Sequence, residues 1–79
     1  MECNIGTILL FAGKYAPENF ALCDGRQMRI SENAALYSIL MDHYGGDNKT
    51  YFNLPKLEAP DANMKYIICT NGMYPVHSN

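Results

Sequence analysis

Residues 16–57 determine most of the fold of this 79-residue chain and read APENFALCDGRQMRISENAALYSILMDHYGGDNKTYFNLPKL. Within it, Phe20–Cys23 is apolar enough for a buried strand. Asp24-Gly25 is a strong signal for a two-residue hairpin turn, because glycine tolerates the positive φ that such turns require. Gln27–Ile30 is therefore expected to pair back on Phe20–Cys23.

A helix is expected next, from about Glu32 to Tyr44. Ser31 stands at the N-cap position, since its hydroxyl can accept a hydrogen bond from an amide two or three residues ahead. Apolar residues recur at the spacing of one helix face, at Ala35, Leu36, Ile39, Leu40 and in part His43. Gly45 and Gly46 supply the left-handed geometry that closes a helix.

Three further segments flank these elements. Ile5–Phe11 has apolar side chains on both faces, which is typical of a strand covered on each side, and Gly13 ends it. Thr50–Leu54 is a short extended piece ended by Pro55, and Tyr66–Thr70 is a late strand. The sequence thus predicts an α+β fold: a small, mainly antiparallel sheet of short strands with one helix packed on it.

The size of the chain allows one domain, 1–79, with a thin stability margin, because such a chain buries only about 60% of its unfolded surface. Small scaffolds compensate with disulfides, a metal or self-association. Cys3, Cys23 and Cys69 allow one bridge but no disulfide-rich framework, and no clustered Cys or His pair predicts a zinc site. Self-association remains, and the apolar fraction of 48% favours a surface that faces another subunit.

Charge and hydropathy exclude several partners. The net charge is −2, and the scattered Lys and Arg residues form no basic stripe, so we expect no nucleic-acid partner. The longest apolar stretch, Ile5–Ala12, is far too short to span a membrane. Glu2 precedes it in place of a basic region, so neither membrane insertion nor a cleavable signal peptide is expected.

A series of residues spread over the chain carries a family resemblance. It comprises Gly6–Gly13, Ala16-Pro17, Phe20–Gly25, Ile30-Ser31, Asn33, Ala35-Leu36, Tyr44–Asp47, Thr50, Phe52, Leu54-Pro55 and Leu57, in this order. The series resembles the phage tail collar domain, a module of the short tail fibres of contractile phages and of microcystin-dependent proteins. Asn63–Pro75 is similar to the closing strand of the longer microcystin-dependent proteins. The resemblance therefore gives a core motif at 5–57 and a closing strand at 64–75.

Two departures from the family pattern matter. Trp often stands where this chain has Phe20, and the long insert before the closing strand is reduced to Glu58–Asn63. A receptor contact or His-rich metal site of that insert is not carried over to this minimal form. The resemblance implies a structural subunit of a phage tail, phage-like particle or extracellular fibre, located in a virion or an extracellular appendage, and not an enzyme.

Few residues are free for chemistry. Cys23 and His43 could be cast as nucleophile and base, but Cys23 lies in a predicted buried strand and is interpreted as a small core residue. Asp47, Asn48 and Thr50 make a weak case for calcium, because no terminal Glu stands at the required spacing. We therefore expect no catalytic residue, no metal and no cofactor.

The expected contacts are instead between copies of the chain. Six tyrosines are too many for so small a core, and the first and last strands lack the charges and prolines that protect a sheet edge. The predicted interface residues are Ile8, Leu10, Tyr15, Tyr37, Tyr51, Tyr66, Ile68 and Tyr74. The product is a closed ring or trimer if the surfaces are self-complementary, and an open fibre if they are not.

An alternative function is a receptor- or glycan-binding module. Exposed aromatic side chains near Asn48, Lys49 and Tyr51 would carry it. Other tail proteins and a cell-surface glycan are the partners that this alternative suggests.

Overall fold

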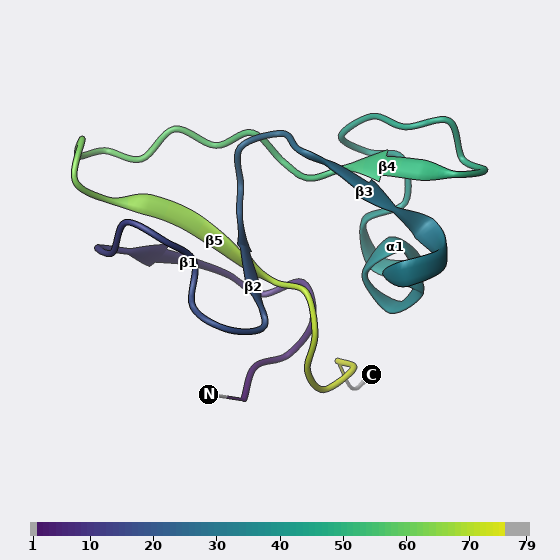
Figure 1. Cartoon of the computed structure of the whole chain (residues 1–79), viewed down its shortest axis with the longest axis horizontal. Coiled ribbons are helices and arrows are strands. Elements are labelled where there is room, and N and C mark those ends of the chain that lie inside the picture. Colours follow the sequence, from purple (N-terminus) through teal and green to yellow (C-terminus); the bar gives the residue numbers. More distant parts are fainter. Residues whose placement is uncertain (1, 76–79) are drawn as a thin grey trace, which may run out of the picture.

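The computed structural model describes residues 2–75, so Met1 and residues 76–79 of the predicted domain lie outside the description. The elements are strand β1 (Ile8–Phe11), strand β2 (Phe20–Leu22), strand β3 (Gln27–Arg29), a 3-10 helix η1 (Ile30–Glu32), helix α1 (Ala34–Leu40), strand β4 (Tyr51–Asn53) and strand β5 (Lys65–Cys69) (Figure 1). All strand pairs between these elements are antiparallel. The predicted α+β class is confirmed.

The larger sheet has three strands in the order β1-β5-β2. β5 lies in the centre, where Ile68 faces Ile8 of β1 on one side and Ala21 of β2 on the other. The prediction that the last strand forms a sheet edge is therefore wrong. The reason is that β5, which buries the consecutive residues Ile67, Ile68 and Cys69, inserts between two strands that precede it in the sequence.

The second sheet pairs β3 with β4, so the predicted hairpin of β2 with β3 is wrong. Gly25 does adopt a positive φ of 81°, but the Asp24 carboxylate accepts hydrogen bonds from the Arg26 amide and from the Arg26 guanidinium, at 2.9–3.1 Å. The Gly25 amide donates to the Pro55 carbonyl. This local turn directs the chain out of the first sheet and into the second, as Figure 1 shows.

Helix α1 is shorter than the expected Glu32–Tyr44. Ser31 lies inside the 3-10 helix η1, and Asn33 is the N-cap of α1, with no capping hydrogen bond from its side chain. The proposed role of Ser31 as an N-cap is therefore wrong. At the other end, Met41 takes a positive φ of 50° and its amide donates to the Tyr37 carbonyl, so the helix ends there.

Gly45 and Gly46 consequently do not close the helix but bring the chain against β4. Their φ values are 114° and 134°, and the Asn53 amide donates to the Gly45 carbonyl. A Cβ on Gly46 would lie 2.7 Å from the Tyr51 carbonyl oxygen, which leaves no room for a side chain. Glycine is required here by the close approach of two backbones.

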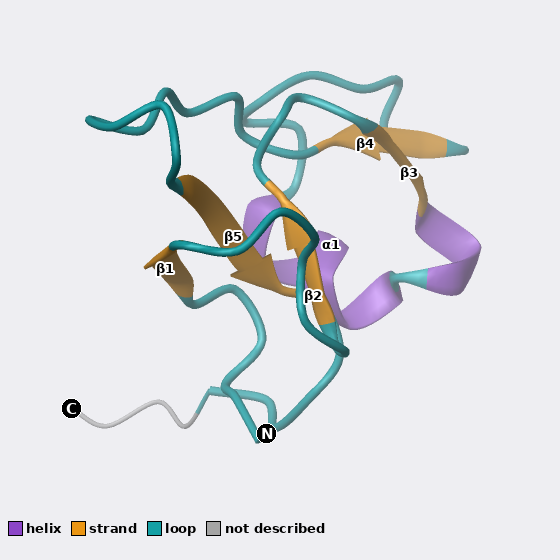
Figure 2. Cartoon of the chain, turned by 60° about the vertical axis from the view of Figure 1, so that its left-hand side comes forward, coloured by secondary structure: helices purple, strands orange, loops and turns teal. Residues whose placement is uncertain are grey.

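One core joins both sheets and the helix. Its buried members are Ile5, Phe20, Ala21, Cys23, Leu36, Leu40, Phe52, Leu54, Ile67, Ile68 and Cys69. The rings of Tyr37 and Phe52 lie 5.4 Å apart, which places α1 directly against the β3–β4 pair. Figure 2 shows α1 behind β2 and β5, so one short helix packs against both sheets. Within residues 2–75, no helix is long and apolar enough to cross a membrane.

Candidate functional site

The edge strand β1 exposes three consecutive large apolar side chains. Ile8, Leu9 and Leu10 are 37%, 42% and 39% exposed. They alternate between the two faces of the strand, so their exposure shows that neither face is fully covered. Among the described strands, β1 pairs with β5 alone, which leaves its other edge free. The expectation of a strand covered on each side therefore does not hold within one copy of the described chain. β2, at the opposite edge, has Phe20 and Ala21 buried.

Two tyrosines lie near β1, one opposite it in the register and one after it along the chain. Leu10 lies opposite the half-buried Tyr66 in the strand register, and Tyr15, in the loop after β1, is 81% exposed. Gly13 also follows β1 and lies in close contact with the Phe11 ring. We name Ile8, Leu9, Leu10 and Tyr15 the β1 surface.

The other predicted interface residues lie elsewhere and are partly used inside the fold. Ile68 is 0% exposed in the central strand, so it cannot contact another copy in this fold. The Tyr37 hydroxyl donates to Asn48 Oδ1 at 3.0 Å. Tyr74 is 54% exposed, but its hydroxyl shares a hydrogen bond with Ser38. Tyr51 is half-buried in β4. The predicted set is therefore not one surface.

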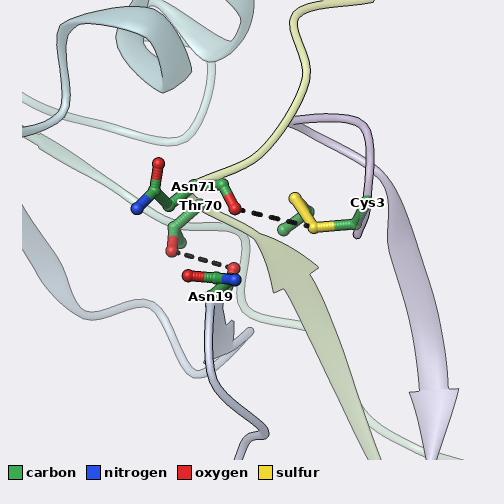
Figure 3. Close-up of a disulfide and its surroundings, with 5 residues drawn as sticks. Cys3, Asn19, Thr70 and Asn71 are labelled. Carbon is green, nitrogen blue, oxygen red and sulfur yellow. Dashed lines mark hydrogen bonds between the residues drawn. A yellow bond between two sulfur atoms is a disulfide. The ribbon is translucent and has the colours of Figure 1, made fainter. Parts of the chain in front are cut away.

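The segment before β1 is linked to the end of β5 and to the residues that follow it. Cys3 and Cys69 form a disulfide with a Cα–Cα distance of 6.1 Å, which realises the one bridge that the cysteine count allowed (Figure 3). Met73 donates its amide to the Cys3 carbonyl and accepts from the Ile5 amide, each at 2.8 Å. Gly72 packs so tightly on the Cys3 carbonyl that no side chain fits there. Cys3 Sγ also lies 3.8 Å from the Asn71 carbonyl oxygen, a packing contact because a disulfide sulfur carries no proton.

The third cysteine is a core residue, as the sequence predicts. Cys23 is 4% exposed, and burial raises the pKa of its thiol, with a smaller contribution from the charge of Asp24. The thiol is therefore protonated and unreactive at neutral pH. His43 lies exposed in the turn after α1.

The loop before β4 is organised by Asp47, a role that sequence reasoning missed. Asp47 Oδ1 accepts hydrogen bonds from the amides of Lys49, Thr50 and Tyr51, and Oδ2 accepts from the Thr50 hydroxyl. These donors, the Thr50 hydroxyl first, hold the pKa of the Asp47 carboxyl well below its ordinary value. Carboxylate oxygens weighed as calcium ligands are thus engaged by their own loop. In the described part of the chain, no three His, Cys, Asp or Glu side chains gather to hold a metal ion.

A polar hollow of about 690 Å³ lies between β3, η1 and this loop. Arg29 and Tyr51 face each other across the β3–β4 pair, and Gln27, Asn33 and Lys49 line the hollow with them. Glu32 lies 4.0 Å from the Arg29 guanidinium, and both side chains are 71% exposed. Two cations, one carboxylate and an aromatic side chain therefore line the same hollow.

Comparison with known proteins identifies the family. The family model described as Phage Tail Collar Domain matches residues 6–60, which is more than half of the chain. No curated protein and no solved structure matches. The resemblance drawn from the sequence is confirmed. The chain therefore belongs to the phage tail collar domain family, which indicates a structural component of a phage tail fibre.

Proposed function

We propose that this chain is a self-assembling structural subunit of a phage tail or phage-like fibre, held to its neighbours by contacts between copies. The observation that carries the proposal is the β1 surface. Three adjacent large apolar side chains stand exposed on an edge strand that has no Pro and no charged residue within Ile8–Phe11. Natural edge strands ordinarily carry such protection against pairing.

The free energy gained by burying this surface can be compared with the cost of association. Full burial of a Leu or Ile side chain is worth roughly 1.5–3 kcal/mol. Covering the exposed two fifths of three such side chains on two copies therefore gives about 4–7 kcal/mol. Association costs about 4–15 kcal/mol in lost freedom of motion. Apolar burial at β1 only begins to offset this cost, so a stable assembly must also use backbone hydrogen bonds or further side chains such as Tyr15.

The test is the oligomeric state of the purified oxidised chain at micromolar concentration. We expect light scattering coupled to gel filtration, and electron microscopy, to show an oligomer. Leu9→Lys should dissociate it, because a charge would be buried at the contact. Leu57→Lys is the matched control, since Leu57 is 39% exposed but lies outside the β1 surface. A monodisperse wild-type monomer would refute the proposal, and circular dichroism of both variants separates dissociation from unfolding.

A second candidate function, binding of an acidic glycan, is favoured by the polar hollow. An aromatic side chain flanked by Arg29 and Lys49, with the amide of Gln27 nearby, offers a stacking face, positive charge and hydrogen-bond donors. A glycan array comparing sulfated or carboxylated sugars with neutral ones tests it. Binding of acidic sugars should fall in Tyr51→Ala and Lys49→Ala but persist in Lys14→Ala, which lies outside the hollow. Equal binding by all variants, or none by the wild type, would refute it.

A further inference from the structure

The free edge of β1 presents the backbone groups of two residues. The Cys69 amide donates to the Thr7 carbonyl at 2.9 Å, and the register pairs Leu9 with Ile67 and Phe11 with Lys65. Residues of an antiparallel strand alternate between those that bond to one neighbour and those whose groups point the other way. Leu9 and Phe11 therefore bond to β5, and Ile8 and Leu10 direct their N–H and C=O groups outward.

The opposite side of β5 supports this assignment. The Cys23 amide donates to the Tyr66 carbonyl at 2.9 Å, and the Thr70 amide donates to the Asn19 carbonyl at 2.8 Å. The backbone groups of the even-numbered residues of β5 thus bond to β2, and those of the odd-numbered residues of β5 bond to β1. Two independent sets of hydrogen bonds fix which groups of β1 remain outside.

We infer that two copies of this chain pair their β1 strands antiparallel about a two-fold axis at Leu9. This inference rests on the proposed function and specifies its contact. Ile8 of one copy then lies opposite Leu10 of the second copy, and each such pair exchanges two hydrogen bonds, giving four in all. The product is one continuous sheet with the strand order β2-β5-β1-β1-β5-β2.

This register is the one that keeps both outward residues inside the paired strands. A shift toward the N-terminus would place Leu10 opposite Gly6, which has a φ of 92° and already donates its amide to the Cys69 carbonyl. A shift toward the C-terminus would place Ile8 opposite Ala12, beyond the end of β1. The axis at Leu9 satisfies every outward group of Ile8 and Leu10 with groups of the same strand.

The side chains fit the same arrangement. On one face, Leu9 of each copy meets its counterpart at the axis as a non-hydrogen-bonded pair, with Cβ atoms about 4.5–5.5 Å apart. On the other face, Ile8 lies beside Leu10 of the second copy, next to Tyr66 in the register. No charged residue occurs in β1, so two copies bring no like charges together. A second copy of this chain is therefore the partner that the edge fits.

Cysteine crosslinking of the full oxidised chain tests the register. We expect Leu9→Cys to form a disulfide-linked dimer in non-reducing gels at micromolar concentration, because its sulfur atoms would meet at the axis. Ile8→Cys is the matched control, with similar exposure but a greater distance to its own counterpart. Preferential crosslinking at Leu10→Cys would overturn the inference in favour of the shifted register.

A proline variant tests the hydrogen bonds separately. Leu10→Pro removes an outward N–H without removing a bond to β5 and should weaken dimerisation about tenfold or more. Unchanged dimerisation would overturn the inference. An oligomer by light scattering that shows no Leu9 crosslink would also overturn it while leaving the proposed function intact, whereas a monomer would overturn both.

Discussion

Loss of the Cys3–Cys69 disulfide is expected to destabilise this domain severely. The bridge joins residues 66 apart in sequence, so it closes nearly the whole chain. Chain entropy assigns about 4 kcal/mol to a loop of this length. A domain of 79 residues has about 4–12 kcal/mol of folding free energy in total. Reduction therefore removes a large share of it, and at about 4–8 °C per kcal/mol the midpoint temperature Tm should fall by roughly 15–30 °C.

Thermal unfolding followed by circular dichroism, with and without a phosphine reductant, measures this loss. Cys3→Ala should unfold at the low temperature with or without reductant. Cys23→Ala is the control, because its disulfide remains and its Tm should stay sensitive to reductant. If reduction lowered the wild-type free energy of unfolding by less than about 1 kcal/mol, the entropic argument would be refuted.

Three further predictions concern the loops and the buried thiol. The carboxyl of Asp47 has a lowered pKa in the folded state, so its contribution to the free energy of unfolding is complete above about pH 4 and is lost as the pH falls below that value. Urea titrations at several pH values should show that Asp47→Asn loses less free energy of unfolding in acid than the wild type does. Gly46→Ala should cost at least about 2 kcal/mol by chemical denaturation, since its Cβ would meet backbone at a positive φ, whereas Gly25→Ala, with only ordinary contacts at 3.4 Å, should cost about 1 kcal/mol. Cys23 should react with a thiol reagent at neutral pH only as fast as the domain opens, and immediate reaction in the native state would contradict its burial.

The sequence predicted those parts of the fold that depend on local patterns. The apolar stripe identified Leu36 and Leu40, both buried, and the strand runs located most strands to within two residues. The α+β class followed from these elements alone. Local pattern was sufficient because burial of one helix face and alternation along a strand are encoded in neighbouring residues.

The errors arose where non-local contacts competed with local signals. Asp24-Gly25 has the composition of a hairpin turn, but β5 pairs with the edge of β2 to which a hairpin partner would bond. No local pattern shows that a strand 40 residues later will insert there. The disulfide pairing is non-local for the same reason, since three cysteines allow three pairings and only the fold selects Cys3 with Cys69.

Among the exposed apolar residues of β1, the sequence indicated Ile8 and Leu10 but missed Leu9. The apolar residues on both faces of the first strand predicted that both faces would be covered, whereas the structure leaves side chains exposed on each face. Asp47 was weighed as a calcium ligand, although its spacing to Thr50 also suits a carboxylate that holds its own loop. In both cases the surroundings of the residue were not predictable from its neighbours in the sequence.

β1 is exposed because the few other elements of this small domain pack elsewhere. The turn at Asp24 sends residues 26–57 into a second sheet, and α1, which has only seven residues, packs against that sheet through Tyr37 and Phe52. Within residues 2–75, no second α-helix covers β1 at the far edge of the first sheet (Figure 1). β1 is nonetheless held in place, since it pairs with β5 and the segment before it is fixed by the Cys3–Cys69 bridge and the Met73 hydrogen bonds. A strand that is held in place but left uncovered suits the proposed contact between copies, since its ordering cost would be met before a second copy bound.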